Sequence, residues 1–101
     1  MKLGLVGLGR MGANMSRRWL RYGHTVVGYA RHADSVTALV KDGAISDGAT
    51  SLAYFVAKLV APRVVWLMVP AASVDDTLEQ LVPLLWSWDV VVDGGFAAMT
   101  I

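Results

Sequence analysis

Apolar residues in this chain fall into short continuous runs, and the segments between the runs carry apolar residues at every third or fourth position. A short apolar run without polar alternation is typical of a strand that is covered on both faces of a sheet. The pattern predicts strands at Lys2–Val6, Thr25–Tyr29, Val64–Val69 and Asp89–Asp93, with a short further strand around Ala44–Ser46.

The segments between these strands predict helices. Met11, Met15 and Trp19 form one apolar stripe, and Gly23 supplies the residue that commonly ends a helix. Side chains that can cap a helix precede the other stripes, and glycine or proline follows them. The expected limits are Asp34 and Gly43 for the second helix, Ser51 and Pro62 for the third, and the capping box Ser73–Asp76 and Pro83 for the fourth.

Strands and helices that alternate at this spacing predict an open, doubly wound α/β fold with a parallel sheet and right-handed crossovers. The expected strand order is 3-2-1-4-5. Asp89–Asp93 is then the last strand, because nothing beyond Gly95 has the length of a strand. We therefore expect one domain over residues 1–95 and a tail over residues 96–101.

Composition excludes several classes of protein. Nine Lys and Arg against eight Asp and Glu leave a net charge of +1, which gives no general reason to bind nucleic acid or an anionic membrane. The chain has no cysteine, so disulfides and thiolate metal sites are excluded, and no carboxylate–histidine metal cluster is evident. The longest uncharged apolar stretch, Val64–Val74, is too short to span a bilayer. We expect a cytoplasmic protein without a bound metal.

The strongest motif is the G-x-G-x-x-G formed by Gly7, Gly9 and Gly12, because it follows a predicted strand and opens a predicted helix. In a dinucleotide-binding turn the first glycine permits the tight turn, the second lets the backbone approach the pyrophosphate, and the third lets the helix pack closely. The helix N-terminus adds free N–H groups and a partial positive charge. The pattern predicts a Rossmann-like cofactor site at Gly7, Leu8, Gly9, Arg10, Met11 and Gly12.

The end of the second strand indicates which cofactor is preferred. Sites for NAD place an acidic residue there to accept from the ribose 2′-hydroxyl, whereas this chain has Ala30, Arg31 and His32. Arg31 can bond a 2′-phosphate and lie against adenine, so NADP is favoured over NAD. His32 is either a further donor or an exposed loop residue.

Three segments together resemble one known family. Gly4–Met15 resembles a G-L-G-x-M-G-x-x-M opening, Val64–Ala71 a strand and loop beside the cofactor, and Val91–Gly95 the start of a D-G-G-N-S motif. They make nearly the whole chain similar to the N-terminal cofactor domain of the 6-phosphogluconate dehydrogenase family, within the β-hydroxyacid dehydrogenase superfamily. The P-R-x-x-W-L-M-V-P pattern at Pro62–Pro70 is closest to the shorter bacterial decarboxylating members.

The resemblance implies an NADP-dependent oxidoreductase of the pentose phosphate pathway. It assigns the pyrophosphate to the glycine turn and the 2′-phosphate to Arg31 and His32. It further places the cofactor's ribose and nicotinamide at the loop that includes Met68, Val69, Pro70 and Ala71, and the sugar acid at Gly94 and Gly95.

The chain also departs from the family pattern. Phe96 and Ala97 stand where the family has Asn and Ser, and the remaining tail resembles nothing in the family. The family's catalytic lysine and glutamate belong to a following helical domain, which these 101 residues lack. We therefore expect no catalytic residue here and a truncated domain that is inactive alone.

Two alternatives remain open. One is a non-catalytic NAD(P)-sensing or interaction module, suggested by Trp86, Trp88 and Phe96 near the C-terminal end. The other is the cofactor domain of a related β-hydroxyacid or imine reductase. We also expect self-association through the C-terminal side, because an edge strand at Asp89–Asp93 would leave backbone groups unpaired. The other expected partner is the nicotinamide dinucleotide.

Overall fold

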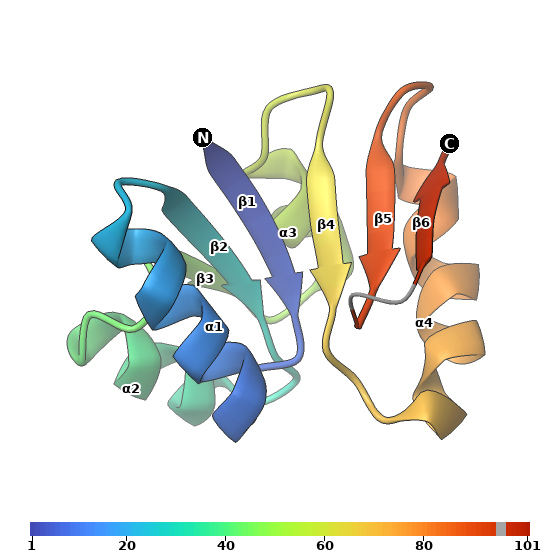
Figure 1. The fold of residues 1–101 in the computed structure, drawn as a ribbon. Coiled ribbons are helices and arrows are strands. Elements are labelled where there is room, and N and C mark those ends of the chain that lie inside the picture. Colours follow the sequence, from blue (N-terminus) through green and yellow to red (C-terminus); the bar gives the residue numbers. More distant parts are fainter. Residues whose placement is uncertain (95–96) are drawn as a thin grey trace.

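A computed structural model describes residues 1–94 and 97–101, and its described strands form one twisted sheet (Figure 1). The sheet order is β3-β2-β1-β4-β5-β6. The first five strands along the chain pair in parallel, and β6 is antiparallel to β5. The predicted order 3-2-1-4-5 is confirmed. The strands are β1 (Lys2–Val6), β2 (Thr25–Tyr29), β3 (Asp47–Ala49), β4 (Val64–Leu67), β5 (Val90–Asp93) and β6 (Ala97–Thr100).

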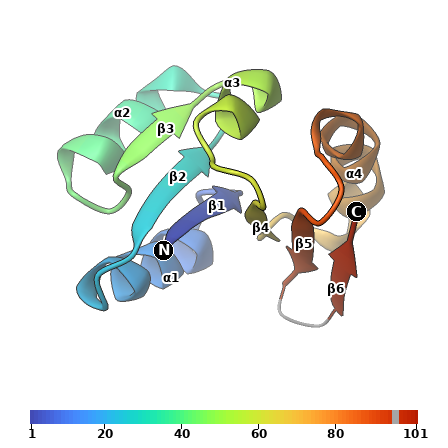
Figure 2. The ribbon, with the colours of Figure 1, turned by 90° about the horizontal axis from the view of Figure 1, so that it is seen from above.

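Helices cover both faces of the sheet, as the view from above shows (Figure 2). Side chains of α1 and α2 pack on one face, and those of α3 and α4 pack on the other. The α-helices are α1 (Arg10–Arg21), α2 (Ala33–Lys41), α3 (Leu52–Ala57) and α4 (Val74–Leu81), and the 3₁₀ turns η1 (Ala71–Ser73) and η2 (Val82–Leu84) flank α4. This three-layer arrangement is the predicted doubly wound fold.

The two faces explain why the strands lack polar alternation. Successive side chains of a strand point to opposite faces. Leu5 accordingly packs in the core under α1 and α2, while its neighbour Val6 packs in the core under α3 and α4. The same holds in β4, where Trp66 packs with its ring centroid 5.5 Å from that of Trp19 in α1, and Leu67 is buried on the other side.

The predicted strand at Ala44–Ser46 is wrong by a few residues, since β3 begins at Asp47. Ala44 and Ile45 are buried, but they belong to the loop. The Ala44 amide donates to Leu39 O at the end of α2, and the buried Ser16 hydroxyl of α1 donates to the carbonyl of Ala44. The apolar pattern therefore indicated burial correctly, but these backbone groups bond to helices instead of a neighbouring strand.

Helix caps follow the prediction in one case and differ in two. Ser51 accepts from the Tyr54 amide at 3.2 Å, as expected of a cap. The second helix begins at Ala33 with His32 as its N-cap, so Asp34 lies in the first turn. Ser73 makes no side-chain cap, and the Thr77 hydroxyl instead donates to the Ser73 carbonyl oxygen at 2.8 Å. The predicted capping box at Ser73–Asp76 is wrong, because the preceding 3₁₀ turn η1 already holds Ser73 in helical backbone geometry.

The expectation that nothing beyond Gly95 forms a strand is also wrong. β6 pairs with β5, and the pairing continues through Trp88 N, which donates to Ile101 O at 3.0 Å, and Ile101 N, which donates to Asp89 O at 2.8 Å. The edge of β5 that motivated the expected self-association is therefore covered by the chain's own tail. Self-association stays a prediction that depends on the exposed Trp86 and Trp88, with 64% and 76% of their surface accessible.

A buried ion pair joins the starts of β4 and β5. The Arg63 guanidinium donates to the Asp89 carboxylate at 2.9 Å, and the amides of Arg63 and Trp86 donate to the same carboxylate. Burial raises the pKa of Asp89, but these hydrogen bonds outweigh it and hold the pKa below the usual value. The Arg63 guanidinium also lies 4.7 Å from the centre of the Trp86 ring. Sequence reasoning did not find this pair.

Candidate functional site

A cleft of about 360 Å³ opens at the carboxyl ends of the central strands. In open α/β sheets this is the end at which ligands bind. Residues from the glycine loop, the end of β2, α3, the loop after β4 and α4 surround it. The lining residues are Val6, Gly7, Leu8, Tyr29, Ala30, Arg31, His32, Leu52, Val69, Pro70, Ser73, Asp76, Thr77 and Gln80.

Gly7 makes the tight turn that carries the chain from β1 to α1. Its φ of +101° is a backbone conformation that L side chains rarely adopt, and a Cβ there would collide with the Met68 carbonyl oxygen. The Gly7 amide donates to Tyr29 O at 3.3 Å, which ties the turn to β2. The role predicted for the first glycine therefore has a direct structural basis.

The other two glycines differ from each other. A Cβ at Gly12 would collide with the Gly7 carbonyl oxygen, so α1 can lie this close to the turn only because residue 12 is glycine. Gly9 has an ordinary φ of −70°, and no atom of the described chain lies within 4 Å of the position of its missing Cβ. Neither packing nor backbone strain accounts for glycine at position 9. The open space above it is a place where a ligand can approach the backbone.

The N-terminus of α1 begins directly after Gly9 and carries backbone donors that have no partner within the helix. The first bond of the helix is donated by Ala13 to Gly9 O at 2.9 Å, so the amides of Arg10, Met11 and Gly12 precede the helical ladder. Gly9, as the N-cap, has no side chain to satisfy them. Met11 is 73% exposed, and Gly9, Arg10, Met11 and Gly12 lie beside the cleft lining, which includes Gly7 and Leu8 but none of these four residues. Such an N-terminus binds anionic groups through its amides and its partial positive charge.

The end of β2 places three predicted residues in the cleft. Ala30, Arg31 and His32 all line it, and the side chains of Arg31 and His32 are exposed. The backbone of His32 has a structural role as well, because its carbonyl accepts from Val36 N at 3.3 Å as α2 begins. Of the described residues that line the cleft, Arg31 and Asp76 carry formal charges when histidine is neutral.

The residues predicted from the loop after β4 and from the end of β5 lie only partly in the cleft lining. Val69 and Pro70 line the cleft, whereas Met68 packs toward the core under α1 and Ala71 lies in η1, outside the lining. Gly94 follows β5 with φ +53°, and its amide donates to Leu67 O at 2.9 Å, away from the cleft lining. Gly95 and Phe96 lie outside the described residues.

Sequence reasoning missed the wall that α4 contributes. Ser73, at the end of η1, and Asp76, Thr77 and Gln80 of α4 all line the cleft, as do the apolar side chains of Leu52 and Val69. The spacing of these four residues places them on one face of a helix. That polar face was visible in the sequence, but only the fold shows that it borders the cleft.

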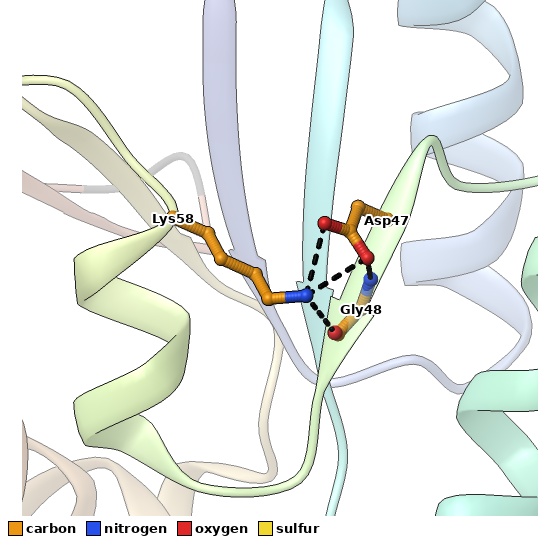
Figure 3. A network of polar contacts seen from close by, with 3 residues as sticks. All are labelled: Asp47, Gly48 and Lys58. Carbon is orange, nitrogen blue, oxygen red and sulfur yellow. Dashed lines mark hydrogen bonds and ion pairs between the residues drawn. The ribbon is translucent and has the colours of Figure 1, made fainter.

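The lysines lie outside the cleft lining. Lys58, at the end of α3, bonds both carboxylate oxygens of Asp47 and the Gly48 carbonyl oxygen at the start of β3 (Figure 3). The Lys58 hydrogen bond lowers the pKa of Asp47, with help from the Gly48 amide. Lys58 therefore has a structural role, in joining the end of α3 to the start of β3.

Residues 1–94 and 97–101 contain neither a cluster of metal ligands nor a membrane-spanning helix. No group of three or more His, Cys, Asp or Glu there could hold a metal ion. No helix in that part of the chain is both long and apolar enough to cross a membrane.

The fold, the glycine turn and the cleft define a dinucleotide-binding domain of the kind found in dehydrogenases. A family model described as the NAD binding domain of 6-phosphogluconate dehydrogenase matches residues 2–100, and the chain belongs to this family. The resemblance found in the motifs is thereby confirmed.

Individual relatives agree. A protein of Haloferax volcanii named as an NAD(+)-dependent, decarboxylating 6-phosphogluconate dehydrogenase is 47% identical over 96 residues, which cover 94% of this chain and 31% of that protein. A putative 6-phosphogluconate dehydrogenase of Bacillus subtilis is 40% identical over 95 residues, with the same two shares. The crystal structure of Synechocystis arogenate dehydrogenase superposes with a TM-score of 0.82 at 29% identity, over 92% of this chain and 32% of that one. The chain thus spans less than a third of the length of the Haloferax volcanii and Bacillus subtilis relatives.

Proposed function

We propose that this chain is the NADP-binding domain of a decarboxylating oxidoreductase related to 6-phosphogluconate dehydrogenase, with NADP preferred over NAD. The observation that carries the proposal is the position of Arg31, which lines the cleft at the end of β2 beside Ala30. An acidic side chain at that point would bind a ribose 2′-hydroxyl and repel a 2′-phosphate, whereas Ala30 and Arg31 do neither.

The residues present fit a nicotinamide dinucleotide. The open space over Gly9 and the amides of Arg10, Met11 and Gly12 suit a pyrophosphate, since the backbone can approach it closely there. The apolar side chains of Leu52 and Val69 line the cleft and offer a surface for a flat ring, and the Arg31 guanidinium can lie against such a ring. When bound, the nicotinamide would accept a hydride from the substrate, and these residues would bind and orient it.

Family membership alone does not decide between the two cofactors. The Haloferax volcanii relative is named as NAD(+)-dependent, although it shares 47% of the aligned residues. The preference must therefore come from individual side chains at the end of β2, and Arg31 is the side chain there that interacts most strongly with a phosphate.

Calorimetric titration of the chain with NADP and with NAD tests the proposal. Arg31→Ala should weaken NADP binding by about 1.5–3 kcal/mol, the range for hydrogen bonds to charged groups, and should change NAD binding little. Arg18→Ala, on the exposed side of α1, is the matched control because it removes the same charge outside the cleft. Equal binding of both cofactors by the unaltered chain, or an equal loss for both in Arg31→Ala, would contradict the assignment.

The second part of the proposal is that these 101 residues alone do not turn over 6-phosphogluconate. Oxidation of the sugar acid needs a positioned base, and Lys2, Lys41 and Lys58 all lie outside the cleft lining. Incubation of the pure chain with NADP and 6-phosphogluconate should give no rise in NADPH absorbance. Substrate-dependent NADPH formation would show that a catalytic group lies within this chain.

A further inference from the structure

The described residues that line the cleft include one charged side chain of each sign when histidine is neutral, and the two come from different elements. Arg31 follows β2, and Asp76 lies in the first turn of α4. The ion pairs of the described residues join Lys58 to Asp47 and Arg63 to Asp89, so these two cleft charges are not paired with each other. Both side chains are exposed, so both can interact electrostatically with a ligand in the cleft.

The difference between the two cofactors is itself a difference in charge. NADP carries a 2′-phosphate where NAD carries a neutral hydroxyl, so every charge in the cleft changes the ratio of the two affinities. Arg31 shifts that ratio toward NADP. A carboxylate in the same cleft shifts the ratio toward NAD, and no other described lining residue carries a formal charge when histidine is neutral.

We propose that Asp76 is a specificity-determining residue that limits the preference for NADP by repelling the 2′-phosphate across the cleft. This inference rests on the proposed function, because it concerns the same cofactor in the same site. Asp76 acts through its charge and not through a contact with Arg31. Its effect should therefore persist when Arg31 is removed.

The chain contains a close control for Asp76. Asp75 is its neighbour in the same first turn of α4 and is also exposed, but it does not line the cleft. Asp75→Asn and Asp76→Asn each remove one acidic group from the N-terminus of α4, so their effects on the stability of that helix should be similar. Only Asp76→Asn removes a charge from the cleft.

The experiment measures dissociation constants for NADP and NAD at low salt for the unaltered chain, Asp75→Asn, Asp76→Asn, and Asp76→Asn combined with Arg31→Ala. Asp76→Asn should raise the ratio of NADP to NAD affinity by about threefold or more, and this gain should shrink as salt is added. The double variant should show a similar gain over Arg31→Ala alone, and Asp75→Asn should show none.

The outcomes separate this inference from the function on which it rests. If the unaltered chain binds neither dinucleotide, both fail. If it binds them and Asp76→Asn leaves the ratio unchanged, or changes it no more than Asp75→Asn does, only the role of Asp76 is refuted. If Asp76→Asn raises the affinity ratio only when Arg31 is present, direct repulsion of the phosphate by Asp76 is refuted, because Asp76 would then act by positioning Arg31. If the unaltered chain prefers NAD but Asp76→Asn still raises the ratio, the role of Asp76 stands and the proposed preference for NADP does not.

Discussion

Alanine substitutions at Gly7 and Gly9 should separate a glycine that the fold requires from a glycine that only a ligand requires. At Gly7 the backbone has φ +101° and a Cβ would meet the Met68 carbonyl oxygen. At Gly9 the backbone is ordinary and a Cβ would meet no atom of the described chain within 4 Å. The two variants add the same methyl group to the same turn, so they differ only in these surroundings.

The structure sets the expected magnitudes. Gly7→Ala combines a left-handed conformation, which costs about 1–2 kcal/mol, with an overpacked contact of about 1–3 kcal/mol. The free energy of unfolding should therefore fall by about 2–5 kcal/mol. Gly9→Ala should change it by less than about 1 kcal/mol, because the reduced entropy of the unfolded chain offsets the poorer N-cap. Its methyl group would instead occupy the space for the pyrophosphate and weaken NADP binding at least about tenfold.

Urea unfolding, followed by tryptophan fluorescence, and calorimetric titration with NADP together test this contrast. Gly23→Ala is a useful control, because Gly23 has φ +87° but no described atom within 4 Å of a Cβ, so it reports the conformational cost alone. Loss of stability in Gly9→Ala equal to that in Gly7→Ala would refute the claim that the fold leaves position 9 free. Unchanged NADP affinity in a stable Gly9→Ala chain would refute the placement of the pyrophosphate.

Two further predictions concern the buried ion pair. Asp89→Asn should lower the free energy of unfolding by about 3–5 kcal/mol, because it leaves the Arg63 guanidinium buried without its charged partner. Asp47→Asn, in the exposed pair with Lys58, should lower it by less than about 1 kcal/mol. Equal effects of the two variants in urea unfolding would contradict this difference. Because folding holds the pKa of Asp89 below its usual value, the contribution of Asp89 to the free energy of unfolding is complete above that usual value and should be lost as the pH falls through the folded pKa. Urea midpoints measured into the acid range should show this loss, and Asp89→Asn should show a smaller one.

The sequence alone determined the order of elements, the two-sided sheet and the glycine turn. These features depend on neighbours close in the chain: Leu5 and Val6 are both apolar because successive side chains face opposite cores, and Gly7 is needed for a turn a few residues long. The end of the second strand singled out Arg31, which lies in the cleft lining, and its contact with a cofactor stays a prediction. Patterns of residues close together in the chain were sufficient for these features, so the fold and the part of the cleft formed by the glycine turn and the end of β2 were predictable.

Only the tertiary structure decided which distant groups pair. β6 pairs with the edge of β5, and the backbone groups of Ala44 and Ile45 bond to α1 and α2. The buried Asp89 pairs with Arg63, which lies 26 residues before it in the chain. The polar face of α4 lines the cleft only because the fold brings Asp76 and the end of β2 to the same cleft. A strand edge, a buried charge or a cleft wall depends on what lies across from it in space. A pattern read along the chain does not contain that information.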